Sequence, residues 1–90
     1  MDKAKVKIEI EKLKVKLSQV KITHKKVNDN NKIQLDGMKS ILANQTTPSA
    51  RQSAKKRIEM KKDQMSNIKK NQASEVDKIK DQIEKYKKML

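Results

Sequence analysis

The sequence predicts an all-α protein, an antiparallel two-helix hairpin of the coiled-coil type. One Gly and one Pro interrupt 90 residues that are rich in Lys, Glu, Gln, Ile, Leu and Met, which is typical of long helices. Apolar residues recur three and four apart, as one face of a helix requires. The chain has one clear candidate for a reversal, near Pro48. We therefore expect a single domain over 1–90, with helices at about 2–44 and 50–90 and a turn at about 45–49.

The first helix is predicted from one face of apolar or compatible residues, here termed the seam. Its members are Val6, Ile10, Leu13, Leu17, Val20, His24, Val27, Asn31, Leu35, Met38 and Leu42. Two alternatives stay open at this point. The period-two alternation over 3–10 is also typical of a half-buried strand. The poor helix formers in 28–31 and at Gly37 would, in the other alternative, divide this segment and give three helices.

The reversal is predicted in the polar segment 44–49, with the sequence Asn-Gln-Thr-Thr-Pro-Ser. Either Thr47 or Ser49 can cap a new helix, and Pro48 suits a first helical position because its missing N–H would be unpaired there anyway. Ser49 to Gln52 also has the spacing of a capping box. The chain therefore turns at Pro48.

The second helix carries a seam with the same rhythm. Its members are Ala54, Ile58, Lys61, Met65, Ile68, Gln72, Val76, Ile79, Ile83, Tyr86 and Leu90. In the antiparallel register set by a turn at Pro48, the two seams mirror each other. Leu42 then meets Ala54, Leu17 meets Ile79, and Val6 meets Leu90. Val27 and Ile68 are one residue out of this register.

Only 33% of the residues are hydrophobic and Tyr86 is the single aromatic, so the chain has too little apolar surface for a deep core. We expect self-association or a partner helix to complete the seam, and disorder is the alternative that this composition also admits. One His, no Cys and one Gly leave no recognisable catalytic, metal or nucleotide motif. The sequence therefore predicts no enzyme, no cofactor and no metal. His24, opposite Gln72, is expected to form a polar layer that fixes the register.

The formal net charge of +13 favours anionic partners. Many lysines fall one residue after a seam position, and in an antiparallel pair these positions share one side. This lysine flank comprises Lys7, Lys14, Lys21, Lys25, Lys32, Lys39, Lys55, Lys62, Lys69, Lys80 and Lys87. Two interpretations stay open: a solvated face whose stems shield the seam, or a face that binds an acidic protein or nucleic-acid phosphates. With two arginines and one tyrosine, sequence-specific recognition of bases has little support.

Two further surfaces follow from the helical period. On the flank opposite the lysines, uncharged residues largely take the place of charged ones. These are Thr23, Gln34, Ile41, Gln64, Asn71, Gln82 and Met89. The first helix also carries an apolar back stripe on the side away from its seam. This stripe consists of Ala4, Ile8, Val15 and Ile22. Spare apolar surface on a thin hairpin indicates a helical partner or adaptor protein; the alternative is a small basic helix bundle that binds DNA or RNA through phosphates.

The expected cellular location follows from the lack of a membrane-spanning run and of a secretory signal in the sequence. No run approaches the eighteen or more apolar residues of a membrane span, and the N-terminus has no uninterrupted apolar stretch of the secretory type. We expect a cytoplasmic protein without a membrane span, and leaderless export stays open.

The segment Lys5-Val6-Lys7-Ile8-Glu9-Ile10, the length, the paired helices around a polar turn and the absence of catalytic motifs together resemble small helical proteins of type VII secretion. These are the WXG100-like proteins and the small partners of LXG-type effectors. The chain lacks Trp-x-Gly at the turn, and Leu90 rather than an acidic residue follows four positions after Tyr86. The resemblance implies an accessory role: binding the helical N-terminal region of a larger effector and keeping it soluble and competent for export. It assigns no functional residue.

Overall fold

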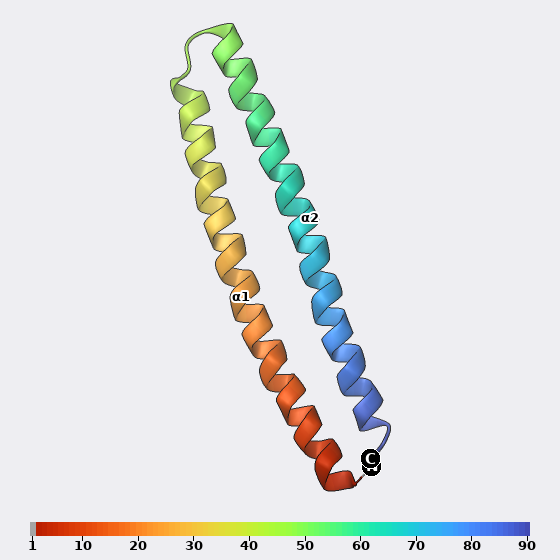
Figure 1. The fold of residues 1–90 in the computed structure, drawn as a ribbon. Helices are drawn as coiled ribbons and strands as arrows, with labels where there is room; N and C mark the ends of the chain where they lie inside the picture. Colours follow the sequence, from red (N-terminus) through yellow and green to blue (C-terminus); the bar gives the residue numbers. More distant parts are fainter. Residues whose placement is uncertain (1) are drawn as a thin grey trace. The chain divides into compact units, whose positions relative to one another are not determined.

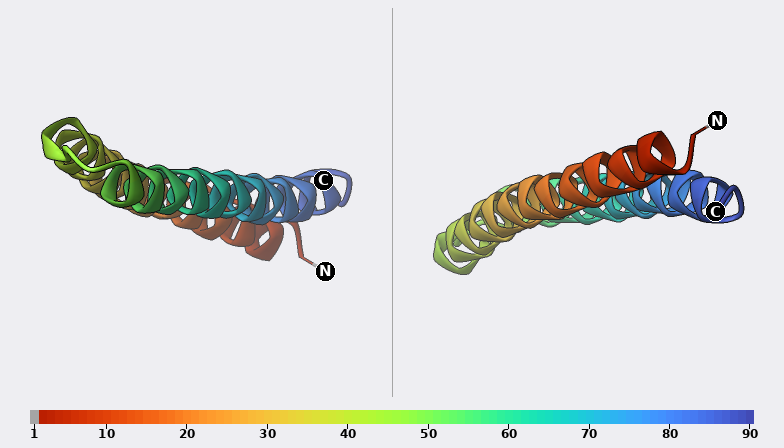
Figure 2. Two further views of the ribbon diagram at one scale, coloured as in Figure 1. Left: turned by 90° about the horizontal axis from the view of Figure 1, so that it is seen from above. Right: turned by 90° about the horizontal axis from the view of Figure 1, so that it is seen from below.

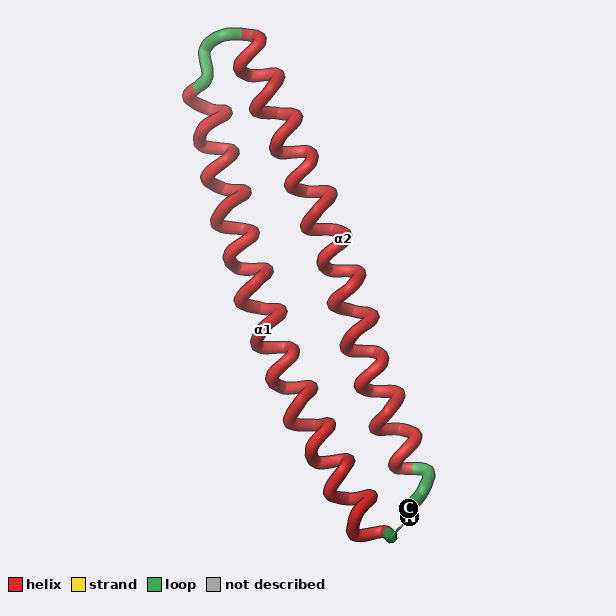
Figure 3. Tube along the Cα trace, in the orientation of Figure 1, coloured by secondary structure: helices red, strands yellow, loops and turns green. Residues whose placement is uncertain are grey.

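In the computed structural model, which describes residues 2–90, the chain forms two long helices, α1 (Lys3–Asn44) and α2 (Pro48–Lys87) (Figures 1 and 3). The chain divides into two compact units, to which both helices contribute. The terminal unit comprises 2–25 and 71–90, and the turn unit comprises Lys26–Lys70. Within each unit the α1 and α2 segments lie side by side and antiparallel (Figure 2). The all-α, two-helix antiparallel fold is confirmed; a single domain over 1–90 stays a prediction.

The strand and three-helix alternatives are wrong, because α1 runs without interruption from Lys3 through 28–31 and Gly37 to Asn44. Gly37 has no positive φ, and a Cβ atom built on it would meet nothing within 4 Å. The backbone at Gly37 is therefore ordinary helix. Packing inside the described chain gives no reason for a glycine at this position.

The core of the terminal unit is a cluster of four buried residues, Val6, Ile10, Ile79 and Ile83. Leu13, Leu17, Val20 and Tyr86 are partly buried and pack against it. All eight are predicted seam residues, so the helical spacing identified this core correctly. Leu90 is the exception: α2 ends at Lys87, and the Leu90 side chain is 48% exposed. It does not continue the seam opposite Val6.

The turn unit has a thinner core, in which only Leu35 and Ile58 are buried. The seam here also departs from the prediction at one position. Val27 is 38% exposed, while Asn28 is partly buried. Asn28 lies four residues after His24 and three before Asn31, so it satisfies the helical spacing as well as Val27 does. The seam therefore includes the polar Asn28, although the sequence analysis chose Val27 because it is hydrophobic.

The turn is held by contacts from both of its ends. The Thr47 hydroxyl accepts a hydrogen bond from the backbone N–H of Ala50 at 3.3 Å, so Thr47 is the N-cap of α2 and Pro48 its first residue. The Arg51 guanidinium donates from Nη1 to the carbonyl oxygens of Leu42 at 3.3 Å and Gln45 at 3.1 Å. Because α1 has no basic residue in its own last turn, Arg51 of α2 supplies the cation that its carbonyl end favours.

Replacing Arg51 with Met is expected to lower the free energy of unfolding by about 1 kcal/mol, because two carbonyl oxygens at the end of α1 lose a charged donor while the apolar stem is kept. Urea denaturation followed by circular dichroism measures the change. The matched control is Lys56→Met, which removes a cation from an exposed neighbouring position of α2. Equal stability of the two variants would show that the Arg51 contacts contribute nothing.

Candidate interaction surfaces

The apolar back stripe lies on α1 within the terminal unit and is exposed along its whole length. The side chains of Ile8, Val15 and Ile22 are 55%, 56% and 58% exposed, and Ala4 is exposed as well. A shallow apolar depression between Ile8 and Val15 is also lined by Lys7, Glu11 and Lys12. The stripe thus offers branched aliphatic side chains about two helical turns apart, a spacing that a second helix can match.

All eleven residues of the lysine flank are exposed. In the turn unit, no ion pair joins any two described residues within Lys26–Lys70. Lys32, Lys39, Lys55 and Lys62 therefore hold their charges in water without an acidic neighbour in contact. Eleven basic residues against four acidic ones give this unit a strong excess of positive charge.

In the terminal unit the lysine flank is less uniformly basic than the sequence analysis proposed. Glu11 and Glu84 occupy the same offset from the seam as the lysines and pair with them. The Lys14 ammonium lies 3.5 Å from a Glu11 carboxylate oxygen, and the Lys87 ammonium lies 3.5 Å from Glu84. Both pairs are three residues apart on one helix, a spacing visible in the sequence. They reduce the charge available to a partner at these positions.

The flank opposite the lysines contains grooves between the helices in both units. In the terminal unit, one groove is lined by residues that include Leu13, Gln82 and Met89, and another by residues that include Val20 and Thr23. Charged residues share these grooves: Glu9 and Lys85 line the first, and Lys16 and Glu75 line the second. The neutral character predicted for this flank therefore does not extend over the terminal unit.

In the turn unit the same flank is nearly free of charge. A groove close to the turn is lined by Met38, Ile41, Gln45, Ala50, Ser53, Ala54 and Arg57. The positions that directly precede the seam residues on the two helices are here termed the uncharged flank. With Asn28 as the first seam residue of this unit, they are Val27, Asn30, Gln34, Gly37, Ile41, Ser53, Arg57, Met60, Gln64 and Asn67. Arg57 is the one charged residue among them, although the Lys61 ammonium also reaches this flank, 2.6 Å from Gln34 Oε1. Ile41 and Met60 are 57% and 68% exposed.

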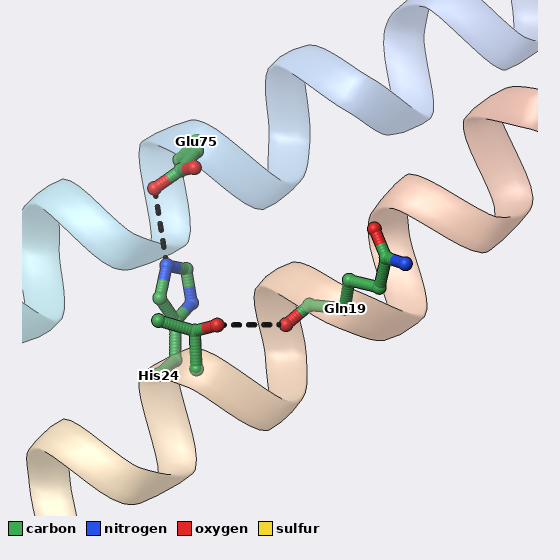
Figure 4. A network of polar contacts seen from close by, with 4 residues as sticks. Gln19, His24 and Glu75 are labelled. Carbon is green, nitrogen blue, oxygen red and sulfur yellow. Dashed lines mark hydrogen bonds and ion pairs between the residues drawn. The ribbon is translucent and has the colours of Figure 1, made fainter.

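A polar contact crosses the seam of the terminal unit at His24 (Figure 4). The His24 side chain, 16% exposed, donates from Nε2 to a Glu75 carboxylate oxygen at 3.0 Å, since an ionised carboxylate can only accept. Next to it, the Thr23 hydroxyl donates to the backbone carbonyl oxygen of Gln19 at 3.0 Å. Sequence analysis placed His24 opposite Gln72, so it identified the polar layer but missed the hydrogen-bond partner.

A second polar layer lies in the turn unit. The partly buried Lys61 donates from Nζ to the side-chain oxygens of Asn31 at 3.1 Å and Gln34 at 2.6 Å. Both Asn31 and Lys61 were predicted seam residues, but their contact was not foreseen, because a long lysine side chain reaches beyond its own level of the seam. Two seam positions, Asn31 on α1 and Lys61 on α2, are thus polar where apolar side chains would otherwise join the helices.

Residues 2–90 were compared with the requirements of a metal site and of a membrane-spanning helix. Over 2–90, no group of three or more His, Cys, Asp or Glu side chains is arranged to hold a metal ion. No helix within this range combines the length and hydrophobicity needed to cross a bilayer.

The antiparallel pairing of two helices around a polar turn, one of the features on which the resemblance to small type VII secretion proteins rests, is present in the structure. This agreement concerns the fold alone. Comparisons with protein-family models, with curated proteins and with solved structures find no match for this chain.

Proposed function

We propose that this chain is a non-enzymatic helical partner protein, which binds a helical region of a larger protein through the apolar back stripe. The observation that carries the proposal is the exposure of Ile8, Val15 and Ile22, each more than half exposed on one face of α1. Covering these side chains with a partner helix removes apolar area from water, at roughly 25 cal/mol per Å². An amphipathic helix that presents apolar residues at matching intervals fits this face.

The charges around the stripe indicate an acidic partner. The terminal unit holds thirteen basic residues against seven acidic ones. Lys7, Lys12 and Glu11 line the depression between Ile8 and Val15, and Lys12 also lies 3.4 Å from a Glu9 carboxylate oxygen. Carboxylates on the edges of a docked helix would lie within reach of these ammonium groups. Such exposed pairs add little affinity each but select the partner and its orientation.

The resemblance to small partners of type VII effectors supplies a role for such a complex. In this proposal the chain covers the helical N-terminal region of an effector before export and keeps it soluble. The single His, the absence of Cys and the lack of a metal-binding cluster over 2–90 support a non-enzymatic role.

Val15→Asp tests the proposal, because it puts a carboxylate into the middle of the stripe at an exposed site. The chain is co-expressed with the helical segments of the proteins encoded beside it, and complexes are detected by size exclusion with light scattering. We expect a complex with the unaltered chain and at least about a tenfold loss of affinity with Val15→Asp, equal to about 1.4 kcal/mol.

The matched control is Ser74→Asp, which places the same charge at an exposed position of α2 in the same unit. It should bind as the unaltered chain does. Absence of any complex, or a complex that Val15→Asp leaves intact, would contradict the proposal.

Phosphate binding is a second candidate function, favoured by the exposed lysines of the turn unit that have no ion-pair partner among the described residues. Binding of DNA or RNA through such lysines would weaken steeply between low and moderate salt, because each phosphate contact releases counterions. Fluorescence anisotropy with a labelled duplex at two salt concentrations measures this dependence. Binding that does not respond to salt would exclude this mechanism.

A further inference from the structure

We propose that the helix bound by the apolar back stripe is an acidic helix with a heptad repeat, which carries apolar residues along its centre and carboxylates along both of its edges. The inference rests on the proposed function and names the chemistry of the partner. It concerns the part of α1 from Ala4 to Ile22, which lies within the terminal unit.

The apolar residues of the stripe repeat with a period of seven. Ile8, Val15 and Ile22 follow one another at this interval, and Ala4 stands about one helical turn before Ile8. Seven residues fall about 20° short of two full turns, so the stripe winds slowly round its helix. A second helix follows such a stripe in the left-handed supercoil of a coiled coil, in which its own apolar residues keep the same repeat. The partner is therefore expected to have heptads.

Lysines occupy both edges of the stripe. The residues that lie one and three positions before Ile8, Val15 and Ile22 are here termed the stripe edges. They are Lys7, Lys14 and Lys21 on one side and Lys5, Lys12 and Gln19 on the other. All six are exposed, and none is a carboxylate. In a coiled coil these positions flank the apolar contact, and their charges select the partner. Glutamates at the facing positions would form ion pairs along both sides.

The chain itself neutralises only part of this charge. Lys12 lies 3.4 Å from Glu9, and Lys14 lies 3.5 Å from Glu11, the one carboxylate within the stripe. Both pairs join exposed side chains three residues apart on α1, so they are weak and leave the ammonium groups accessible to a further carboxylate. No ion pair among the described residues involves the other three lysines of the edges.

The same lysines disfavour the back stripe of a second copy as the occupant. Because both edges are basic, two stripes packed together would bring lysines face to face in either orientation. An anionic membrane would also attract the lysines. However, the stripe has only one large apolar residue in each seven, and the chain contains no Trp or Phe to anchor it at a bilayer surface. The edges and the repeat together fit an acidic helix best.

The test uses three synthetic peptides, each about three heptads long. The first has leucine at its central positions and glutamate at both edges, the second has lysine at the edges instead, and the third contains the residues of the first in scrambled order. Fluorescence anisotropy measures their binding to the full chain at about 150 mM NaCl. We expect the acidic heptad peptide to bind at least about tenfold more tightly than the other two.

Charge reversal on each edge locates the contact. Lys7→Glu combined with Lys12→Glu should weaken binding of the acidic heptad peptide about tenfold and strengthen binding of the lysine peptide. The matched control is Lys39→Glu combined with Lys55→Glu, which makes the same change of charge at exposed positions of the turn unit. It should leave both affinities within about twofold, because salt screens distant charges.

Three outcomes of the peptide experiment would overturn the inference. They are no binding of the acidic heptad peptide, equal binding of the lysine or scrambled peptide, and binding that the reversal at Lys7 and Lys12 leaves unchanged. Binding of the chain to phosphatidylserine vesicles that Val15→Asp abolishes, without binding of the acidic heptad peptide, would assign the stripe to a membrane instead. A natural complex that Val15→Asp disrupts would still support the proposed function after any of the first three, so the two failures are distinguishable.

Discussion

Replacing Ile79 with aspartate is expected to unfold the chain. Ile79 is 3% exposed and belongs to the cluster formed with Val6, Ile10 and Ile83. A carboxylate at this position would have no cation among those apolar side chains, and an uncompensated buried charge costs about 3–5 kcal/mol. That is comparable with the whole free energy of unfolding of many small domains, about 5 kcal/mol at the lower end. Far-ultraviolet circular dichroism should show loss of most helical signal at room temperature.

Val15→Asp is the control for this experiment as well, because it adds the same residue to α1 at a 56% exposed site. It should retain the helical signal, and its melting temperature should change by only a few degrees. If Ile79→Asp melted like Val15→Asp, the cluster of the terminal unit would not be the core of this chain.

The second large effect is expected in the opposite direction, from the polar layer of the turn unit. Substituting leucine for both Asn31 and Lys61 removes a partly buried ammonium and its amide acceptor from the seam and adds apolar contact near Leu35 and Ile58. Replacement of polar groups in such layers by apolar residues is often stabilising, here by about 2 kcal/mol. A rise of about 10 °C in melting temperature should follow.

Lys62→Leu serves as its control, since Lys62 is the exposed neighbour of Lys61. Its melting temperature should stay close to that of the unaltered chain. A double variant less stable than the unaltered chain would mean that the hydrogen bonds from Lys61 to Asn31 and Gln34 outweigh the desolvation of the ammonium group.

Helical periodicity predicted the fold class and most of the core, because burial on one face of a long helix leaves a direct trace in residue spacing. Ile10, Leu13, Ile79 and Ile83 were all identified in this way. Val27 was not placed correctly, because two routes with helical spacing pass from His24 to Asn31. Hydrophobicity alone favoured Val27, whereas in the structure Asn28 is the more buried.

The surfaces were predictable to a smaller extent. Exposure of the back stripe and of the lysines follows from their offset from the seam, and the structure agrees. Contacts made by long side chains did not follow. Arg51 reaches Leu42 and Gln45 across the turn, and Lys61 reaches Asn31, because flexible stems can choose among several acceptors. Interhelical grooves also depend on how far each helix is rotated about its axis, which spacing does not specify.

The Arg51 contacts at the turn have a consequence for the order in which the chain folds. Their acceptors, Leu42 and Gln45, lie only nine and six residues away in sequence, so the reversal can close early, on the submicrosecond timescale of short loops. Pairs between the arms then bring together residues that are progressively farther apart along the chain, each at a small added entropic cost. We therefore expect pairing to spread from the reversal along the two helices, with the contacts of Val6 formed last.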